Sequence, residues 1–150
     1  MPKPELEFFR PDDLPWEPVS GSPRTGVGGP LVRQKILSRD PATGAVTRLL
    51  RLEAGLETSE VIAHDYWEEV WILEGELLDL GKNQRFSAGM YACRPPGMVH
   101  GPYRVERRCL NLEIHYPGCG SGRPGPTGHR AACRAVIHLC TGIHNAKIAR

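Results

Sequence analysis

Three residues in the middle of the chain could bind a metal ion together. His64 is followed four residues later by Glu68, and His100 comes soon after the rigid PPG turn at 95–97. Two imidazoles and a carboxylate are donors that suit a divalent transition metal. At a corner between strands, His64 and Glu68 could both point into one cavity. A single histidine is more often a surface or hydrogen-bonded residue than a ligand, so the prediction depends on the joint pattern.

The elements that must position these residues are mostly short strands. Turn signals such as DPATG at 40–44 and GKN at 81–83 separate apolar or β-branched runs of strand length. Short strands separated in this way predict an all-β sandwich or barrel. The expected strands are 31–37, 46–52, 60–64, 70–73, 76–80, 84–86, 90–93, 103–105 and 109–116.

The composition fits one globular domain. Of the 150 residues, 40% are hydrophobic and 24% are charged, which argues against intrinsic disorder. Every apolar run is shorter than the roughly 20 residues that span a bilayer, and the start MPKPELEFFRPDD lacks the pattern of a secretion signal. We therefore expect a cytoplasmic protein whose five cysteines are reduced thiols. The net charge of +2 is too small to indicate a nucleic-acid partner.

Three segments differ in composition. Residues 1–30 are rich in Pro and Gly and are expected to form an N-terminal arm packed on the body. Residues 31–117 hold the predicted strands, and residues 118–150 form a basic tail rich in Gly, Pro and Cys. Within the tail, the apolar spacing at 133–140 favours a helix, while the Cys and His spacings are not those of a zinc finger.

Around the candidate ligands, two blocks of residues have a recognisable spacing. They are His64, Glu68 and Gly75 in the first block, and Gly89, Pro95, Gly97 and His100 in the second. The blocks resemble the two signatures of the cupin superfamily, and WEEVWILEGEL at 67–77 is typical of small single-domain cupins of the RmlC-like and ChrR-like types. The resemblance covers about residues 31–116. It implies a double-stranded β-helix of the jelly-roll type with a metal site inside the barrel mouth.

The resemblance implies four metal ligands, of which this chain supplies three, namely His64, Glu68 and His100. The position of the fourth, two residues before His64, is occupied by Ile62. The remaining set suits Fe(II), with Zn, Mn, Ni or Cu as alternatives, and leaves positions open for substrate and oxygen. The other interpretation is a decayed site that binds metal weakly or not at all and holds a small ligand.

Four residues are expected to shape a substrate pocket: Ile62, Tyr91, Cys93 and Arg104. Tyr91 and Cys93 share a parity on the strand before the Pro-rich turn. Arg104 stands where the cupin signature ends in Asn. An inward-pointing Arg104 could clamp an anionic substrate, whereas an outward-pointing one would pair with Glu106 or solvent.

The parity of two further strands decides which side chains face the cavity. The spacing to Gly75 selects Glu68 rather than its neighbour Glu69, since only one of them can point inward. In the strand 109–116, the apolar residues are expected to face the barrel interior. His115 would then point away from the metal, and it is not predicted to be a ligand.

Two classes of function stay open, because fold does not fix function. The first is a metal-dependent enzyme, an Fe(II) dioxygenase-like cupin that binds a small oxygenated organic acid or diketone together with O₂. The second is a non-catalytic ligand- or metal-sensing module, similar to the cupin half of ChrR-type regulators, or a cupin with a degenerate metal site. The expected partners are a small-molecule ligand and a second copy of the chain in a homodimer, without nucleic acid or membrane.

Overall fold

The computed structural model describes residues 3–25 and 29–118, and the regular structure in these residues is nearly all β. One 3-10 turn, η1, lies at Pro11–Asp13. The strands are β1 (Glu17–Pro18), β2 (Arg24–Thr25), β3 (Gly29–Pro30), β4 (Val32–Arg39), β5 (Val46–Leu52), β6 (Leu56–Glu57), β7 (Tyr66–Glu74), β8 (Glu76–Asp79), β9 (Gln84–Ser87), β10 (Tyr91–Arg94), β11 (Tyr103–Val105) and β12 (Cys109–Pro117).

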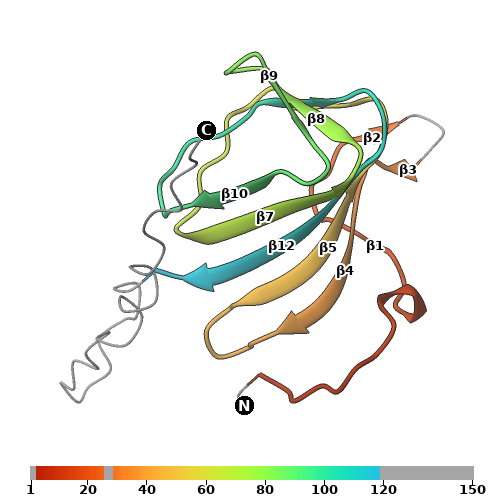
Figure 1. Ribbon diagram of the computed structural model, residues 1–150, viewed down its shortest axis with the longest axis vertical. Helices are drawn as coiled ribbons and strands as arrows, with labels where there is room; N and C mark the ends of the chain where they lie inside the picture. The colour runs from red at the N-terminus through yellow and green to blue at the C-terminus, as the bar shows by residue number, and fades with distance from the viewer. Residues whose placement is uncertain (1–2, 26–28, 119–150) are drawn as a thin grey trace, which may run out of the picture. The chain divides into compact units, whose positions relative to one another are not determined.

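Most strands belong to two antiparallel sheets, which form the two layers visible in Figure 1. The larger sheet has the order β1-β4-β5-β12-β7-β10, and the smaller has the order β6-β11-β8-β9. Strands β2 and β3 pair separately. The chain crosses from one sheet to the other and back, so that the consecutive strands β7 and β8 lie in different layers. This arrangement confirms the predicted all-β jelly-roll.

An apolar core joins the two layers. Leu50, Leu52 and Ile72 come from the larger sheet, and Leu56 and Leu77 come from the smaller one. All of these side chains are buried. Burying one such side chain contributes about 1.5–3 kcal/mol. The core therefore fixes how the two sheets face each other.

The same strands become polar toward the opposite end of the barrel. On β7 the inward positions run from Ile72 through Val70 to Glu68, and on β12 they run from Cys109 to His115. Packing at the apolar end fixes the register of the strands. The polar end can therefore hold buried side chains that could bind a ligand or a metal.

The N-terminal segment lies along the edge of the larger sheet. Strand β1 pairs with β4, and the Trp16 ring lies under the charged ends of Lys35 and Arg51, at 4.9 and 4.4 Å. Lys35 also donates a hydrogen bond to the carbonyl oxygen of Pro11 at 2.9 Å. The predicted tail helix at 133–140 lies outside the described residues. In the part of the chain that the structure describes, no helix is long and apolar enough to cross a membrane.

Strand β7 begins earlier than the sequence predicts. We expected a strand at 70–73, whereas β7 starts at Tyr66. Glu68 therefore sits inside a paired strand rather than at a corner. The expected strand at 60–64 is reduced to a single bridge between Ile62 and His100.

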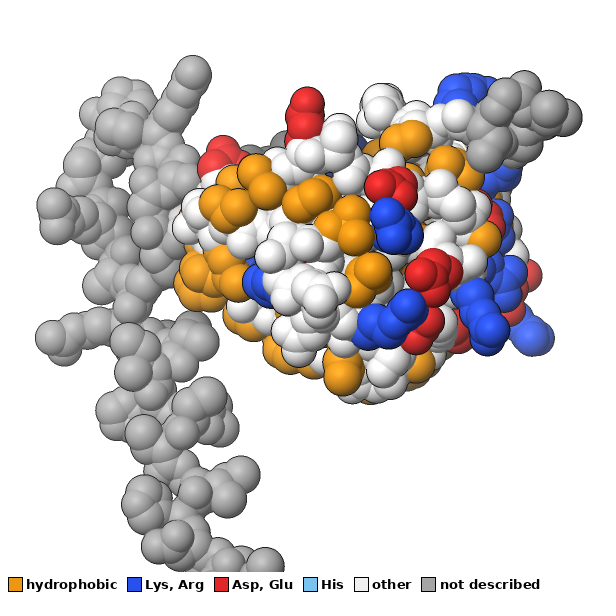
Figure 2. Space-filling model, turned by 90° about the horizontal axis from the view of Figure 1, so that it is seen from above, with side chains coloured by type: hydrophobic (Ala, Val, Ile, Leu, Met, Phe, Trp, Pro, Cys, Tyr) orange, Lys and Arg blue, Asp and Glu red, His pale blue; other side chains and the backbone are white. Residues whose placement is uncertain are grey.

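The outer surface of the smaller sheet carries exposed ion pairs. Arg85 contacts Glu76 at 2.7 Å and Glu106 at 3.0 Å, and Arg104 contacts Glu57 at 2.8 Å. Figure 2 shows acidic and basic side chains lying next to each other on one face of the molecule. Exposed pairs of this kind are screened by solvent and contribute little to stability, so the fold depends chiefly on its core.

Gly75 is the point at which the chain passes from β7 into β8. Its φ is +75°, which side chains of L-residues rarely adopt. A Cβ atom at this position would also collide with the carbonyl oxygen of Arg108. The crossing between the sheets thus requires glycine for two reasons.

Replacing Gly75 by alanine should destabilise the protein by about 2–5 kcal/mol, because backbone strain and a steric collision add together. Gly55→Ala is the matched control. Gly55 has a φ of +87° but open space around it, so this change should cost about 1–2 kcal/mol. The measurement is the free energy of unfolding in denaturant. Equal losses in the two variants would contradict the close approach at Gly75.

Candidate metal centre

Glu68 lies in a row of side chains that crosses the larger sheet. On β7 it is directly opposite Arg94 of β10 and directly opposite His115 of β12. Residues opposite each other on neighbouring strands point to the same face of a sheet, so all three side chains enter the barrel. Glu68 is 4% exposed. A carboxylate removed from water in this way requires compensating partners.

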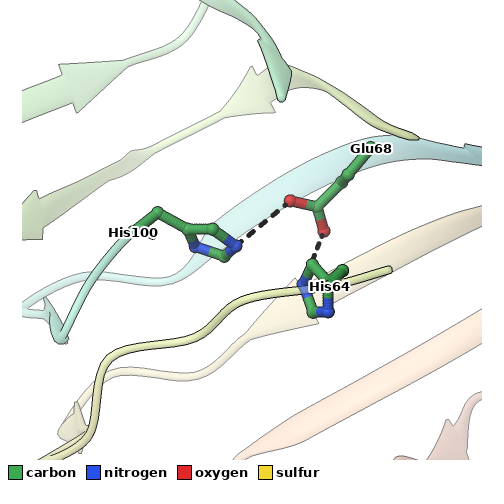
Figure 3. Close-up of side chains that lie close together, drawn as sticks. All are labelled: His64, Glu68 and His100. Atoms are coloured by element: carbon green, nitrogen blue, oxygen red, sulfur yellow. Dashed lines mark ion pairs between the residues drawn. The ribbon is translucent and has the colours of Figure 1, made fainter. Parts of the chain in front are cut away.

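Four side chains approach the two oxygens of this carboxylate. Nη1 of Arg94 is 2.5 Å from Oε2, and Nε2 of His100 is 3.6 Å from the same oxygen. Nε2 of His64 and Nε2 of His115 lie 3.6 and 3.5 Å from Oε1. Figure 3 shows the Glu68 carboxylate lying between the rings of His64 and His100. Three imidazole nitrogens thus point toward one carboxylate.

A tyrosine ring holds two of the histidines in place. Tyr66, the first residue of β7, stacks on His64 with ring centroids 4.6 Å apart and an interplanar angle of 13°. It also stacks on His115 at 4.8 Å. The backbone of His64 is fixed as well, because its carbonyl oxygen accepts a hydrogen bond from the N–H of Gly97 at 2.7 Å. The PPG turn therefore supports the loop that carries His64.

His100 is held by its backbone and by its second ring nitrogen. Its N–H and carbonyl form two hydrogen bonds with Ile62, at 3.0 and 2.8 Å. Its Nδ1 lies 3.1 Å from the hydroxyl of Tyr103, which also accepts a hydrogen bond from Arg94 at 3.1 Å. Engaging Nδ1 leaves Nε2 directed at Glu68. Such a second contact orients the ring of a metal-binding histidine.

The electrostatics keep Glu68 ionised and His100 neutral. Burial on its own would raise the pKa of Glu68, but interactions with His115 and Arg94 outweigh it and lower the pKa to about 2. Burial, assisted by the charge of Arg94, lowers the pKa of His100 to about 4. An ionised carboxylate and a neutral imidazole are the forms that bind metal. Burial would lower the pKa of His115, but Glu113 and Glu68 outweigh burial and raise it.

A second buried carboxylate, Glu113, is already paired. Arg48 contacts its Oε2 with Nη2 at 2.7 Å and with Nε at 2.8 Å. Arg48 is itself positioned by Gln34, which accepts a hydrogen bond at 3.0 Å. Nε2 of His115 lies 3.4 Å from the same Glu113 oxygen. Glu113 is thus neutralised by an arginine on one side and faces a histidine on the other.

The donor set fits a divalent metal ion. The donor atoms of His64, Glu68 and His100 lie within 4.8 Å of one another, and so do those of Glu68, Glu113 and His115. Ligands about 2.1 Å from one ion stand about 3.0–3.4 Å apart, close to the distances around Glu68. Among the described residues, Nε2 of His100 and of His115 are buried polar atoms without a hydrogen-bond partner. A metal ion would satisfy such atoms.

A cavity of about 190 Å³ adjoins these donors. Pockets that take drug-sized ligands have volumes of about 300–1,000 Å³, so this cavity is smaller. An apolar wall faces the donors, so a ligand there would be small and partly apolar. The wall includes Leu50, Leu52, Leu56 and Leu77, and the polar end includes His64 and His100.

The structure brings together the three residues that the sequence predicts as ligands, but it separates most of the predicted substrate residues from them. Ile62 lines the cavity. Tyr91 and Cys93 are exposed on the outer face of β10, which corrects their assignment to the pocket. Arg104 is also exposed and pairs with Glu57, so it is not positioned to clamp a ligand beside the metal centre.

The predicted parity of β12 was wrong. Cys109, Asn111, Glu113 and His115 are buried, and the apolar residues between them are half-buried on the other face. His115 therefore points into the barrel. The physical reason is that this end of the barrel buries charged groups, so its inward positions are polar. The run of polar residues at alternate positions was a signal of this.

Arg94 is a site residue that the sequence analysis missed. On β10 its side chain lies on the same face as that of Ala92. The sequence prediction instead directed the opposite face, with Tyr91 and Cys93, toward the pocket. Arg94 immediately precedes the PPG turn at 95–97, and its direction is set by its pairing with Glu68 across the sheet. The register was not readable from the sequence alone.

Comparison with known proteins identifies the fold and the family. A family model described as the ChrR cupin-like domain matches residues 5–117. No curated protein sequence matches the chain.

Several solved structures share the fold. An RmlC-like cupin from Ralstonia eutropha is 18% identical with a TM-score of 0.61, over 75% of this chain and 69% of that one. An RmlC-like cupin from Shewanella frigidimarina is 18% identical with a TM-score of 0.59, over 79% and 96%. An acetylacetone dioxygenase from Acinetobacter johnsonii is 17% identical with a TM-score of 0.58, over 75% and 74%.

Replacing Glu68 by glutamine should destabilise the protein in the presence of a chelator by about 3–5 kcal/mol, because Arg94 would be left buried without its counter-charge. Glu57→Gln is the control, since it breaks an exposed, solvent-screened pair with Arg104 and should cost far less stability. Both values come from denaturant unfolding. Similar losses in the two variants would mean that the Glu68 carboxylate does not balance the charges of this site.

Proposed function

We propose that this chain, which belongs to the ChrR cupin-like family, binds a divalent transition metal through His64, Glu68 and His100. The metal would hold a small oxygenated organic molecule in the adjoining cavity. The observation that carries this proposal is the buried Nε2 of His100, which has no hydrogen-bond partner among the described residues and points at the Glu68 carboxylate. Buried polar atoms in proteins are otherwise paired.

The charges around the cavity favour an anionic ligand. Glu68 is paired with Arg94 and Glu113 with Arg48, so these four groups sum to zero. A divalent ion would add two positive charges to a buried region. An uncompensated charge there is costly, and an enolate or a carboxylate on the ligand would reduce it.

Each residue has a distinct task in this proposal. His64, Glu68 and His100 bind the metal, and Tyr66 and Tyr103 orient the imidazole rings through stacking and hydrogen bonding. The leucines of the cavity wall exclude water. When bound, a metal such as Fe(II) would act as a Lewis acid and would bring the organic ligand and O₂ together.

A dioxygenase-like reaction is the favoured activity. Two imidazoles and one carboxylate that leave positions open are a typical ligand set of non-haem Fe(II) oxygenases. An acetylacetone dioxygenase shares the fold of this chain, and this likeness supports the same class of chemistry. We therefore propose Fe(II) as the metal and a diketone or an oxygenated organic acid as the substrate class.

A ligand- or metal-sensing module is the second candidate. The family match to the ChrR cupin-like domain favours it. Such a module would use the same donors and cavity without turnover. The homodimer and the cytoplasmic location stay predictions under either function.

Protein purified without a His tag and loaded with Fe(II) should hold about one ion per chain and should consume O₂ with members of a panel of diketones, phenolic ketones and organic acids. His100→Ala should lower the metal content and abolish the O₂ consumption, because it removes a buried ligand. Elemental analysis and an oxygen electrode measure the two effects.

Cys93→Ser is the control for this experiment, since Cys93 is exposed outside the cavity and its replacement should leave both quantities unchanged. Stoichiometric metal without O₂ consumption for any compound would favour the sensing module. Metal content that does not fall in His100→Ala would contradict the proposed site.

A further inference from the structure

A second cavity lies between the edge strands of the two sheets, and we call it the side cavity. It has a volume of about 180 Å³ and is lined by residues of β7 and β10 in the larger sheet and of β8 and β9 in the smaller one. None of the three proposed metal ligands lines it, whereas Val70, Leu77 and Arg94 line both cavities. Tyr91 and Cys93, which were predicted from the sequence to shape a substrate pocket, border the side cavity and not the first one. The side cavity is thus a separate space that shares a wall with the metal centre.

The floor of the side cavity is apolar, and its rim is exposed. The floor consists of buried or half-buried side chains, namely Val70, Ile72, Leu77, Phe86 and Ala92. At the rim, Met90 and Met98 are 46% and 37% exposed. Methionine side chains are unbranched and adapt to ligands of different shape. Because apolar cavities of about 150 Å³ can bind benzene, the side cavity has room for one ring or a short alkyl chain.

The charged side chains that line the side cavity, Lys82 and Arg94, are both cationic. Arg94 is already engaged, since its two terminal nitrogens donate to Glu68 and to the hydroxyl of Tyr103. Nζ of Lys82 lies 3.7 Å from Oδ2 of Asp79, which is too long for a hydrogen bond. An ammonium group has three donors. Lys82 can therefore keep this contact with Asp79 and bind an anion as well.

The backbone of Lys82 is held at the rim by the turn after β8. Asp79 is 1% exposed, and its Oδ1 accepts a hydrogen bond from the backbone N–H of Lys82 at 2.9 Å. Gly81 packs so closely on the loop that follows His100 that a Cβ atom there would lie 2.8 Å from the carbonyl oxygen of Gly101. The Lys82 side chain itself is 47% exposed. A fixed backbone thus carries a partly hydrated ammonium group beside an apolar floor.

We propose that the side cavity is a second ligand site, which binds a small amphipathic anion, namely a carboxylate carried by one ring or a short alkyl chain. The apolar part lies on the floor, and the carboxylate meets Lys82 at the rim, where it stays partly hydrated. A head group at the rim avoids the cost of burying a charge. This site uses none of the proposed metal ligands, so it does not depend on the proposed function.

Phenylacetate and the uncharged phenylacetamide are matched probes, since they carry the same ring and have nearly the same size. The full chain has three methionines, Met1, Met90 and Met98, so the NMR signals of ¹³C-labelled methionine methyl groups report on the rim of the side cavity. In the presence of a chelator, phenylacetate should shift the signals of Met90 and Met98 and leave that of Met1 unchanged. Phenylacetamide should bind about three- to tenfold more weakly, because it lacks a charged hydrogen bond that solvent partly screens.

Lys82→Gln should weaken phenylacetate binding about three- to tenfold and leave phenylacetamide binding unchanged. A general loss of structure would weaken the binding of both probes. Arg85→Gln is the matched control, because Arg85 lies on the adjacent β9 but pairs with Glu76 and Glu106 outside the side cavity. At physiological salt, which screens distant charges, it should change neither affinity.

Three results would overturn the inference. Signals of Met90 and Met98 that stay unshifted at millimolar phenylacetate would mean that the side cavity is not a ligand site. Equal affinity for the two probes, or an equal loss of both in Lys82→Gln, would mean that the cavity does not select an anion. Binding that requires added metal and disappears in His100→Ala would assign the ligand to the metal centre instead.

Discussion

The buried carboxylate of Glu68 is the constraint on which the rest of this structure depends. A carboxylate out of water must be compensated, and Arg94 and three imidazoles surround it. They reach it because β7 lies between β10 and β12, in a register that the apolar core at the other end of the barrel holds. The sheet order and the crossing at Gly75 therefore matter for the site as well as for the fold.

The charges around Glu68 also limit what the cavity can accept. Glu68 and Glu113 are each already paired with an arginine, so a divalent cation is tolerated best together with an anionic ligand. Ile62 lines the same cavity and has no donor atom, so it would leave a coordination position of the metal open for an organic ligand. In this interpretation the charges of the metal, the ligand and the protein compensate one another.

The sequence predicted the fold well and the site in part, for physical reasons that differ from residue to residue. Glycines, prolines and β-branched runs mark turns and strands locally, and β5 and β11 have the predicted bounds. The spacing of His64, Glu68 and His100 was enough to predict these three residues as candidate metal ligands. The predicted face was wrong for His115, because apolar residues normally face inward and on β12 the polar ones do. It was also wrong for Cys93, because the half-buried residues of β10 are Ala92 and Arg94. Arg94 was missed because its role depends on the register between β7 and β10, which only the folded sheet defines.

The central claim is that His64, Glu68 and His100 form one metal centre. Anomalous diffraction at the zinc edge, from crystals of the full chain grown with Zn²⁺, tests this most directly. We expect one strong peak beside the Glu68 carboxylate, within bonding distance of Nε2 of His64 and of His100. Crystals grown in excess Zn²⁺ without a peak at this position, with Arg94 still paired to Glu68, would contradict it.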